Sequence, residues 1–192
     1  MTHSVNQNVE AALASFRTAG RWFSPKEINE NQGPVPRYAG LYGWWFRAPP
    51  PKVDMDGTIQ RDGFSLLYVG IAPQRPAANG RTSKRTLHQR LRNHCRGPIA
   101  TSTFRRSLAF LLAEDLGFQI IKGADGKVRI GREAEARLTD WIDQNARVSW
   151  VIHPEPWLLE DALISNGPRL PLNIRGSIDP FSRELRRIRA MA

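Results

Sequence analysis

Apolar residues along the chain gather in short aromatic runs that proline, glycine and aspartate separate. Two of these runs, residues 38–46 and 64–71, have the length and composition of β-strands. A shorter apolar run at residues 148–153 predicts a further strand. The first two runs carry the tripeptides Gly40-Leu41-Tyr42 and Tyr68-Val69-Gly70, so pairing of these strands would bring two phenols into one site.

Helical periodicity, with apolar residues three or four positions apart, marks other stretches of the chain. Polar, glycine or proline neighbours supply their starts and stops. The predicted helices span residues 9–16, 83–95 (starting at Thr82 or Ser83), 102–117, 132–145, 157–165 and 182–191.

The segments between these elements contain residues that break regular structure. Residues 24–37 predict an irregular lead into the first strand, and the triple proline at 49–51 excludes a central strand from residues 48–63. Asp125-Gly126 between two short alternating runs predicts a β-hairpin within residues 118–130. A chain of 192 residues is long enough for a substantial core, and we expect one compact domain.

The balance of charges narrows the class of partner. The chain has 28 Lys and Arg against 18 Asp and Glu, a net charge of +10 at pH 7 and an isoelectric point of about 10.8. Arginine greatly outnumbers lysine, and its planar guanidinium suits two-pronged contacts with phosphate. The composition favours a polyanion such as nucleic acid as partner, although a basic protein without such a partner has the same composition.

The single cysteine, Cys95, excludes an intrachain disulfide and any zinc site that needs several cysteines. This is typical of a reducing compartment. The sequence shows no pattern of a secretion signal and no apolar run of membrane-spanning length. We therefore expect a cytoplasmic protein with no membrane partner.

The predicted helix at residues 83–95 carries an arginine and a histidine one turn apart. Successive residues about 100° apart place Leu87 and Leu91 on the core face, with Arg90 and His94 along its edge. Basic residues near its start and on its outer side are candidates for nucleic-acid contacts: Arg81, Lys84, Arg85, Arg92 and Arg96.

Glu160 lies on the apolar side of the predicted helix at residues 157–165. It shares a continuous arc with Leu159 and Leu163, and Asp161 lies at the edge of that arc. An ionised carboxylate among apolar residues needs a partner. The helix leaves two equal alternatives, an arginine that pairs with Glu160 or a divalent cation that it binds.

Taken in order, these residues resemble the motifs of the GIY-YIG endonuclease superfamily. The family's two tripeptides correspond to Gly40-Leu41-Tyr42 and Tyr68-Val69-Gly70, and its helical pair corresponds to Arg90 and His94. The family's metal-binding glutamate corresponds to Glu160, and its asparagine corresponds to Asn173, which follows Pro171-Leu172.

The resemblance divides the chain into three parts. A nuclease domain would span residues 38–175, with insertions at about 48–63, 72–82 and 118–130. An N-terminal helix and lead-in would precede it at residues 1–37, and a basic helix would follow at residues 176–192.

The resemblance also implies an α+β fold and a chemistry. Helices would flank a small three-stranded antiparallel sheet, with inserted loops and an extra hairpin. The reaction would be hydrolysis of a phosphodiester bond in double-stranded DNA, with one divalent cation, Mg²⁺ or Mn²⁺, per active site. Glu160 would be the protein ligand of that cation, because hard cations prefer oxygen ligands.

The resemblance implies a role for each remaining motif residue. Tyr42 would be the general base for the attacking water, and His94 would relay its proton or orient the phosphate. Arg90 would stabilise charge on the phosphate. Tyr68 would position the water or contact the phosphate, and Asn173 would orient a phosphate oxygen or a neighbouring side chain.

Some features depart from the family pattern. Gln89 precedes Arg90 where some members have lysine, and the spacings from Tyr42 to Tyr68 and from Gly70 to Arg90 are wide. Insertions around a small core are similar to the restriction-enzyme branch, and a double-strand cut would suit a homodimer. The alternatives are a repair or mobile-element nuclease and a protein of this fold that binds nucleic acid without cutting it.

Overall fold

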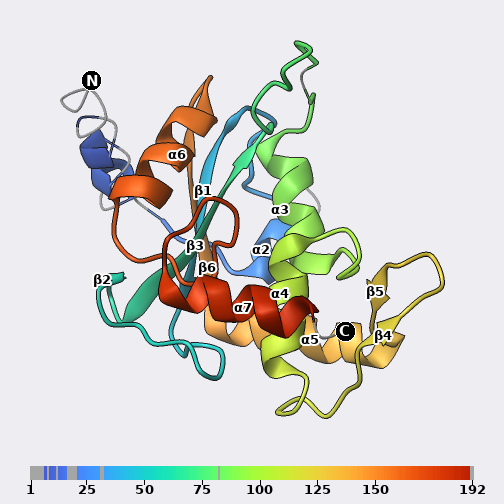
Figure 1. Ribbon diagram of the computed structural model, residues 1–192. Coiled ribbons are helices and arrows are strands. Elements are labelled where there is room, and N and C mark those ends of the chain that lie inside the picture. Colours follow the sequence, from blue (N-terminus) through green and yellow to red (C-terminus); the bar gives the residue numbers. More distant parts are fainter. Residues whose placement is uncertain are drawn as a thin grey trace.

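The computed structural model describes residues 7, 9–11, 13–16, 21–30, 33–81 and 83–190. Across these residues an antiparallel sheet runs through the centre, and helices cover both of its faces (Figure 1). The strand order is β2-β3-β1-β6. The elements are β1 (Gly40–Phe46), β2 (Ile59–Arg61), β3 (Phe64–Ala72), β6 (Ala146–Ile152), the hairpin β4 (Ile121–Lys122) and β5 (Val128–Arg129), and the helices α2 (Pro25–Asn29), α3 (Leu87–Arg96), α4 (Thr103–Leu112), α5 (Arg132–Asn145), α6 (Pro156–Asn166) and α7 (Pro180–Ala190).

The α+β class is confirmed, but the expected count of three strands in the sheet is wrong. Within the segment predicted as an insertion, β2 pairs with β3 and makes a fourth strand. The predicted irregular lead also contains α2, because Ser24 and Glu27 form a capping box at its start. The predicted hairpin within residues 118–130 is present as β4 and β5.

Several predicted helices differ in extent from the structure, and α4 ends at Leu112 rather than at residue 117. α3 begins at Leu87 rather than at residue 83, because Thr86 caps it and exchanges hydrogen bonds with Gln89. Thr82 lies outside the described residues. The predicted N-terminal helix at residues 9–16 lies partly outside them too, and its described members are helical. The C-terminal helix α7 ends the described chain at Ala190.

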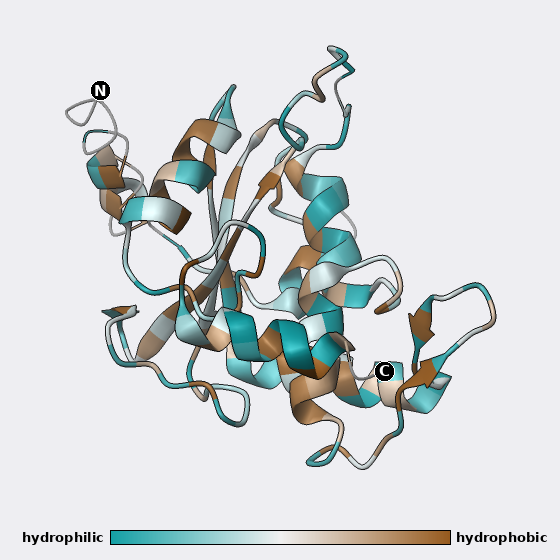
Figure 2. Cartoon of the chain, viewed as in Figure 1, coloured by the Kyte–Doolittle hydropathy of each residue, from teal (hydrophilic) through white to brown (hydrophobic). Residues whose placement is uncertain are grey.

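Both faces of the sheet are buried, which explains the unbroken apolar runs in the sequence. Along β1, Leu41 and Trp45 pack on the side of α6, whereas Tyr42, Trp44 and Phe46 pack on the side of α3, α4 and α5. Figure 2 shows the apolar residues concentrated on the strands and polar residues on the outer sides of the helices. No helix within the described ranges is both long and apolar enough to cross a membrane.

The register of β3 on β1 decides which way the second tyrosine points. Trp44 pairs with Tyr68 and Trp45 pairs with Leu66, so Leu67 is an extra residue in β3. Residues that pair across strands point to the same side of a sheet. Tyr68 therefore shares a face with Trp44 and Tyr42, and the two phenols lie near one another.

The glycines of the two tripeptides leave room for close packing. Gly70 lies opposite Tyr42, and a side chain there would collide with the phenol of Tyr42. A side chain at Gly40 would collide with the backbone of Val151 and with Leu87 of α3. Both positions therefore need glycine because neighbouring groups occupy the space of a Cβ atom.

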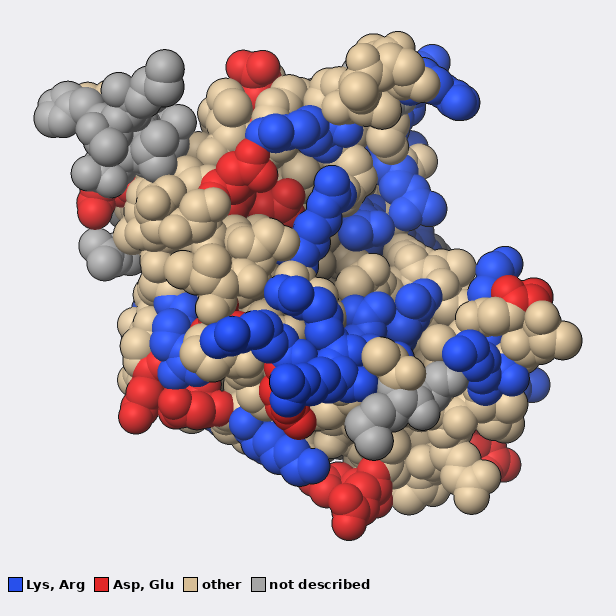
Figure 3. All heavy atoms as spheres, viewed as in Figure 1, with Lys and Arg blue, Asp and Glu red and all other residues tan. Residues whose placement is uncertain are grey.

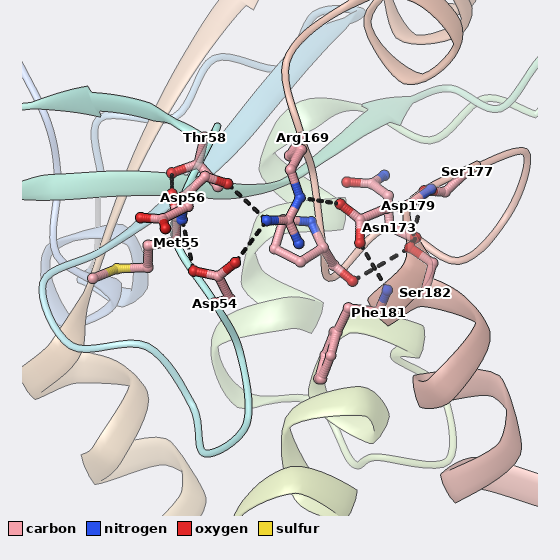
Figure 4. A network of polar contacts seen from close by, with 11 residues as sticks. Asp54, Met55, Asp56, Thr58, Arg169, Asn173, Ser177, Asp179, Phe181 and Ser182 are labelled. Atoms are coloured by element: carbon pink, nitrogen blue, oxygen red, sulfur yellow. Dashed lines mark hydrogen bonds and ion pairs between the residues drawn. The ribbon is translucent and has the colours of Figure 1, made fainter.

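Arg169 ties the inserted segment to the C-terminal part of the chain (Figure 4). Its Nη1 donates to Asp54 Oδ2 at 2.9 Å and to Asp56 O at 2.8 Å. Its Nε donates to the buried Asp179 at 2.9 Å, immediately before α7. Residues 54–56 are thus held against the start of α7.

A buried arginine, Arg105, joins α3, α4 and α5. Arg105 is fully buried, and its guanidinium donates to Cys95 O at 2.9 Å, Glu135 Oε2 at 2.8 Å and Thr139 Oγ1 at 3.0 Å. Breaking a buried pair of this kind by removing one partner is strongly destabilising. The start of α4, which reaches the motif residues, is therefore firmly anchored.

Candidate active site

A cleft of about 540 Å³ opens between α6, the later part of β3 and the C-terminal segment. Tyr68, Arg90, Glu160 and Asn173 line this cleft. Tyr42 and His94 do not line it, and both are fully buried directly behind. The structure thus brings the six motif residues together in two layers, one facing the cleft and one supporting it.

The cleft forms beside an open edge of the sheet. β2 pairs with residues 64–66 of β3, and no other strand among the described residues lies beside the later part of β3 on that side. Asn173 covers this edge: its Oδ1 accepts from Val69 N at 2.9 Å, and its Nδ2 donates to Val69 O at 2.8 Å. Leu172 N donates to Leu67 O at 3.0 Å. Asn173 therefore satisfies the backbone of the second tripeptide as a paired strand would.

The phenol of Tyr42 lies at the centre of the supporting layer. Its Oη lies 2.7 Å from His94 Nε2 and accepts from Arg90 Nε at 3.3 Å. Burial raises the pKa of Tyr42, while the charge and hydrogen bond of Arg90 oppose this rise. Arg90 is thus positioned to favour the ionised form of a phenol that burial keeps neutral.

Tyr68 is the phenol that reaches the cleft. Burial raises its pKa well above the usual range, and the neighbouring Tyr42 adds to the rise. Its ring centroid lies 6.4 Å from that of Tyr42, so the two phenols are direct neighbours. Only Tyr68 combines this contact with direct access to the cleft.

His94 is held on both of its ring nitrogens. Its Nδ1 lies 2.7 Å from Ser102 Oγ, and its Nε2 contacts Tyr42. Trp44 and Phe104 pack edge-on against the imidazole. Burial, with the nearby arginines, lowers its pKa well below the usual range, so the ring is neutral at pH 7.

Glu160 lies on α6 at the opposite wall of the cleft. Burial raises its pKa to about 7, and Asp161 adds to the rise while Arg175, Arg90 and Arg75 oppose it. No ion pair of Glu160 is formed within the described residues, whereas the adjacent Asp161 pairs with Arg75. Of the two alternatives for Glu160, a bound cation fits this carboxylate better than a salt bridge.

A family model described as the GIY-YIG catalytic domain matches residues 40–191. The chain belongs to the GIY-YIG family. Neither the curated proteins nor the solved structures contain a match to the chain. Membership identifies a nuclease of the GIY-YIG superfamily, a class of DNA-binding hydrolases that generally depend on a divalent metal.

The carboxylate of Glu160 fits the metal site of a GIY-YIG nuclease. It is a hard oxygen ligand, it is partly buried, and it faces the cleft. No group of three or more acidic, histidine or cysteine side chains that could hold a metal occurs among the residues described. An ion held by Glu160 would therefore take its other ligands from water and phosphate, as Mg²⁺ commonly does.

Several residues that line or support this cleft were not predicted from the sequence. Arg75, Arg175 and Arg189 line the cleft, and Ser102 supports His94. Arg189 comes from α7, where it is half-buried with a pKa lowered by burial and by Arg106. The arginine-rich α7 stretch was the only sequence signal for it, because position in the cleft depends on how α7 docks.

The residues predicted to contact nucleic acid lie on one side of this GIY-YIG cleft. All five predicted residues are exposed: Arg81, Lys84, Arg85, Arg92 and Arg96. Arg85 lines an adjoining hollow of about 220 Å³ that shares Ile71, Gln74 and Arg90 with the cleft. Figure 3 shows Lys and Arg gathered over α7 and along α3, beside acidic atoms on α6.

Proposed function

We propose that the protein is a metal-dependent DNA endonuclease that hydrolyses phosphodiester bonds in duplex DNA at the cleft. One observation supports this most strongly: a partly buried carboxylate, with no ion pair inside the described part of the chain, faces an arginine and a tyrosine across one cleft, with the rest of the motif directly behind. A protein that only binds DNA would have no use for such a carboxylate, because it repels phosphate.

Glu160 is the residue that would hold Mg²⁺ or Mn²⁺, one ion per active site. The ion would supply positive charge to the phosphate and the leaving oxygen. Arg90, which lines the cleft and contacts Tyr42, would donate to a phosphate oxygen as negative charge builds up on it. These two groups account for electrostatic stabilisation of the transition state.

Tyr42 and Tyr68 would share the role of general base. The expectation that Tyr42 meets the attacking water directly does not fit its complete burial behind the cleft. We assign the contact with water to Tyr68 and the final proton acceptor to the phenolate of Tyr42. The water gives its proton to Tyr68 Oη as Tyr68 gives its own proton to Tyr42 Oη, so the charge moves inward toward Arg90 and His94.

Asn173 has a supporting role in this proposal. Both polar atoms of its amide are engaged by Val69, and it is only 4% exposed. We therefore assign it to holding β3 beside Tyr68 rather than to contact with a phosphate oxygen.

The positive surface on both sides of the cleft supports duplex DNA as the substrate. Arg85 extends the cleft toward α3, and Arg175 and Arg189 extend it toward α7. Each offers N–H donors that suit phosphate oxygens. Contacts on two sides of one scissile phosphate would hold the strand in register over Glu160.

The biological role that we propose is that of a type II restriction enzyme. Hydrogen bonds from Arg169 hold the insertion at residues 48–63 in place. The insertion would therefore offer a fixed surface to the DNA that is bound at the cleft. One cleft per chain would cut one strand, and a homodimer would place two clefts on a two-fold symmetric site. Discrete fragments from unmodified DNA would support this role, and structure-dependent nicking would support a repair or mobile-element nuclease instead.

The decisive experiment compares two neighbouring carboxylates. Wild-type protein, Glu160→Gln and Asp161→Asn are incubated with supercoiled, linear and branched DNA in Mg²⁺ or Mn²⁺. We expect wild type and Asp161→Asn to cut within several-fold of each other, and Glu160→Gln to lose about 10³-fold or more, because Glu160, unlike Asp161, forms no ion pair with any other described residue. Binding without cleavage by wild type on every substrate would refute the enzyme assignment, and full activity of Glu160→Gln would refute the metal ligand.

A further inference from the structure

Ser102 takes part in two interactions, the cap of α4 and a contact with His94. It is the N-cap of α4, and its Oγ accepts from Arg105 N at 3.1 Å. The same Oγ lies 2.7 Å from His94 Nδ1. Ser102 and His94 are both fully buried, so each polar hydrogen there needs an acceptor within the protein.

The available donors and acceptors decide which atom donates in the contact between Ser102 and His94. If His94 Nδ1 carried the proton, Ser102 Oγ would accept from both His94 and Arg105, and its own hydroxyl hydrogen would have no acceptor among the described residues. A buried unpaired polar hydrogen costs about 1–3 kcal/mol. The arrangement without this cost has the Ser102 hydroxyl donating to Nδ1 of a neutral imidazole.

We propose that Ser102 fixes His94 in the tautomer that carries its proton on Nε2. His94 Nε2–H then donates to Tyr42 Oη, where Arg90 Nε–H also donates. Two donors then point at the oxygen of the Tyr42 phenol, an arrangement that favours its ionised form. When Tyr42 ionises, the same two donors stay in place around the phenolate.

The consequence is a one-way chain of hydrogen bonds from the start of α4 to the phenol directly behind the cleft. Arg105 N–H donates to Ser102, Ser102 to His94 and His94 to Tyr42. Ser102 is thus a positioning residue, because it acts on the reaction only through His94. Its effect on cleavage rests on the proposed function, whereas its effect on the tautomer does not.

Nitrogen-15 NMR of histidine-labelled full-length protein at pH 7 tests the tautomer directly, with His94→Gln used to assign the signals. We expect wild type and Ser102→Thr to show His94 protonated only on Nε2. Ser102→Gly removes the hydroxyl but retains most of the capping stability, and we expect a mixture of tautomers or protonation on Nδ1. Ser102→Asp keeps a cap with acceptor oxygens only, and we expect Nδ1 to be protonated.

Ser24→Gly is the matched control, because it removes the hydroxyl that caps α2 away from the cleft. It should leave the His94 signals unchanged. Protonation of His94 on Nδ1 in wild type, or an unchanged Nε2–H tautomer in Ser102→Gly, would overturn the proposal.

Cleavage kinetics then test the consequence for the reaction. We expect Ser102→Gly to lower kcat about 10- to 100-fold with little change in KM, the range found when the partner that orients a functional histidine is removed. Ser102→Thr should recover most of the activity. Unchanged kcat in a variant whose tautomer has shifted would overturn the link to cleavage. A tautomer shift in a protein that cuts no DNA would leave Ser102's role standing and refute the proposed function.

Discussion

Asn173 and Val69 form a closed pair at the edge of the sheet, with one hydrogen bond in each direction at 2.9 and 2.8 Å. The side chain of one residue thereby replaces a neighbouring strand beside Tyr68. Ser182 of α7 donates to Asn173 O, so the same residue also joins the sheet to the C-terminal helix. The position of the cleft-side phenol therefore depends on a residue about a hundred positions later, as the separation of 104 between Val69 and Asn173 shows.

Asn173→Ala should lower the free energy of unfolding by about 1–3 kcal/mol, because it leaves buried backbone groups of Val69 without partners. Urea denaturation measures this loss, and cleavage assays should show reduced activity as β3 loosens. Asn145→Ala is the matched control, since its side chain donates within α5 to Trp141 O at 2.9 Å. Unchanged stability together with lost cleavage would instead indicate direct contact of Asn173 with the phosphate.

Glu160→Gln should change how stability depends on pH. Burial raises the folded-state pKa of Glu160 to about 7, above its unfolded value near 4.5. The folded state therefore binds this proton more tightly than the unfolded state does. The protonated carboxyl contributes its full stability to the fold below pH 4.5, and this contribution is lost as the pH rises through 7. Relative to wild type, the variant should gain up to about 3 kcal/mol between pH 4 and pH 8.5, at about 1.4 kcal/mol per pKa unit.

Chemical denaturation of both proteins in a chelator measures this difference, and other titrating groups cancel in the comparison. Added Mg²⁺ should stabilise wild type at pH 8 and leave Glu160→Gln unchanged. Parallel pH profiles of the two proteins would contradict a raised pKa for Glu160.

Metal concentration should move the acid limb of the pH–rate profile. Protons and the cation compete for the Glu160 carboxylate, whose pKa is about 7 without metal. At low Mg²⁺ the rate should fall below about pH 7, and each tenfold rise in Mg²⁺ should shift this limb toward lower pH by up to about one unit. Steady-state cleavage at several metal concentrations measures the shift. An acid limb that stays in place would assign it to another group.

Tyr42→Phe and Tyr68→Phe should each lower kcat by about 10²- to 10⁴-fold, the usual contribution of a general base. Because the two phenols pass one proton, the double variant should be no slower than the slower single variant. In wild type the rate should rise with pH above neutrality, because both phenols have raised pKa values and the ionised fraction grows tenfold per pH unit. Additive losses in the double variant would mean that the tyrosines act independently.

Arg189→Ala should weaken DNA binding and reduce its dependence on salt. The guanidinium is half-buried in the cleft, and among the described residues it has no ion pair, only a hydrogen bond to Ser107 Oγ at 3.4 Å. Loss of one phosphate contact should lower the slope of log affinity against log salt by about 1. Binding titrations with Glu160→Gln as the background avoid cleavage. Arg132→Ala on α5, exposed and outside the cleft, is the matched control.

The sequence by itself determined the elements that follow local patterns and the order of the motif. The helix at residues 132–145 agrees with α5, because its start and stop signals and its apolar stripe are local. The two tyrosine tripeptides fall within β1 and β3, and the α+β class and the family follow from motifs that can be read in order. Propensity, capping and periodicity act over a few residues, so sequence reveals them.

Only the tertiary structure decided the features that depend on distant contacts. β2 forms between proline-rich and glycine-rich segments because β3 pairs with it and Arg169 holds the segment beside it. The register of β3 on β1 and the docking of α6 decide that Tyr68 meets the cleft while Tyr42 lies behind it. Ser102 reads as an ordinary helix cap until α4 packs against α3 and brings it to His94. Burial and alignment across long separations set these relationships, and no local pattern encodes them.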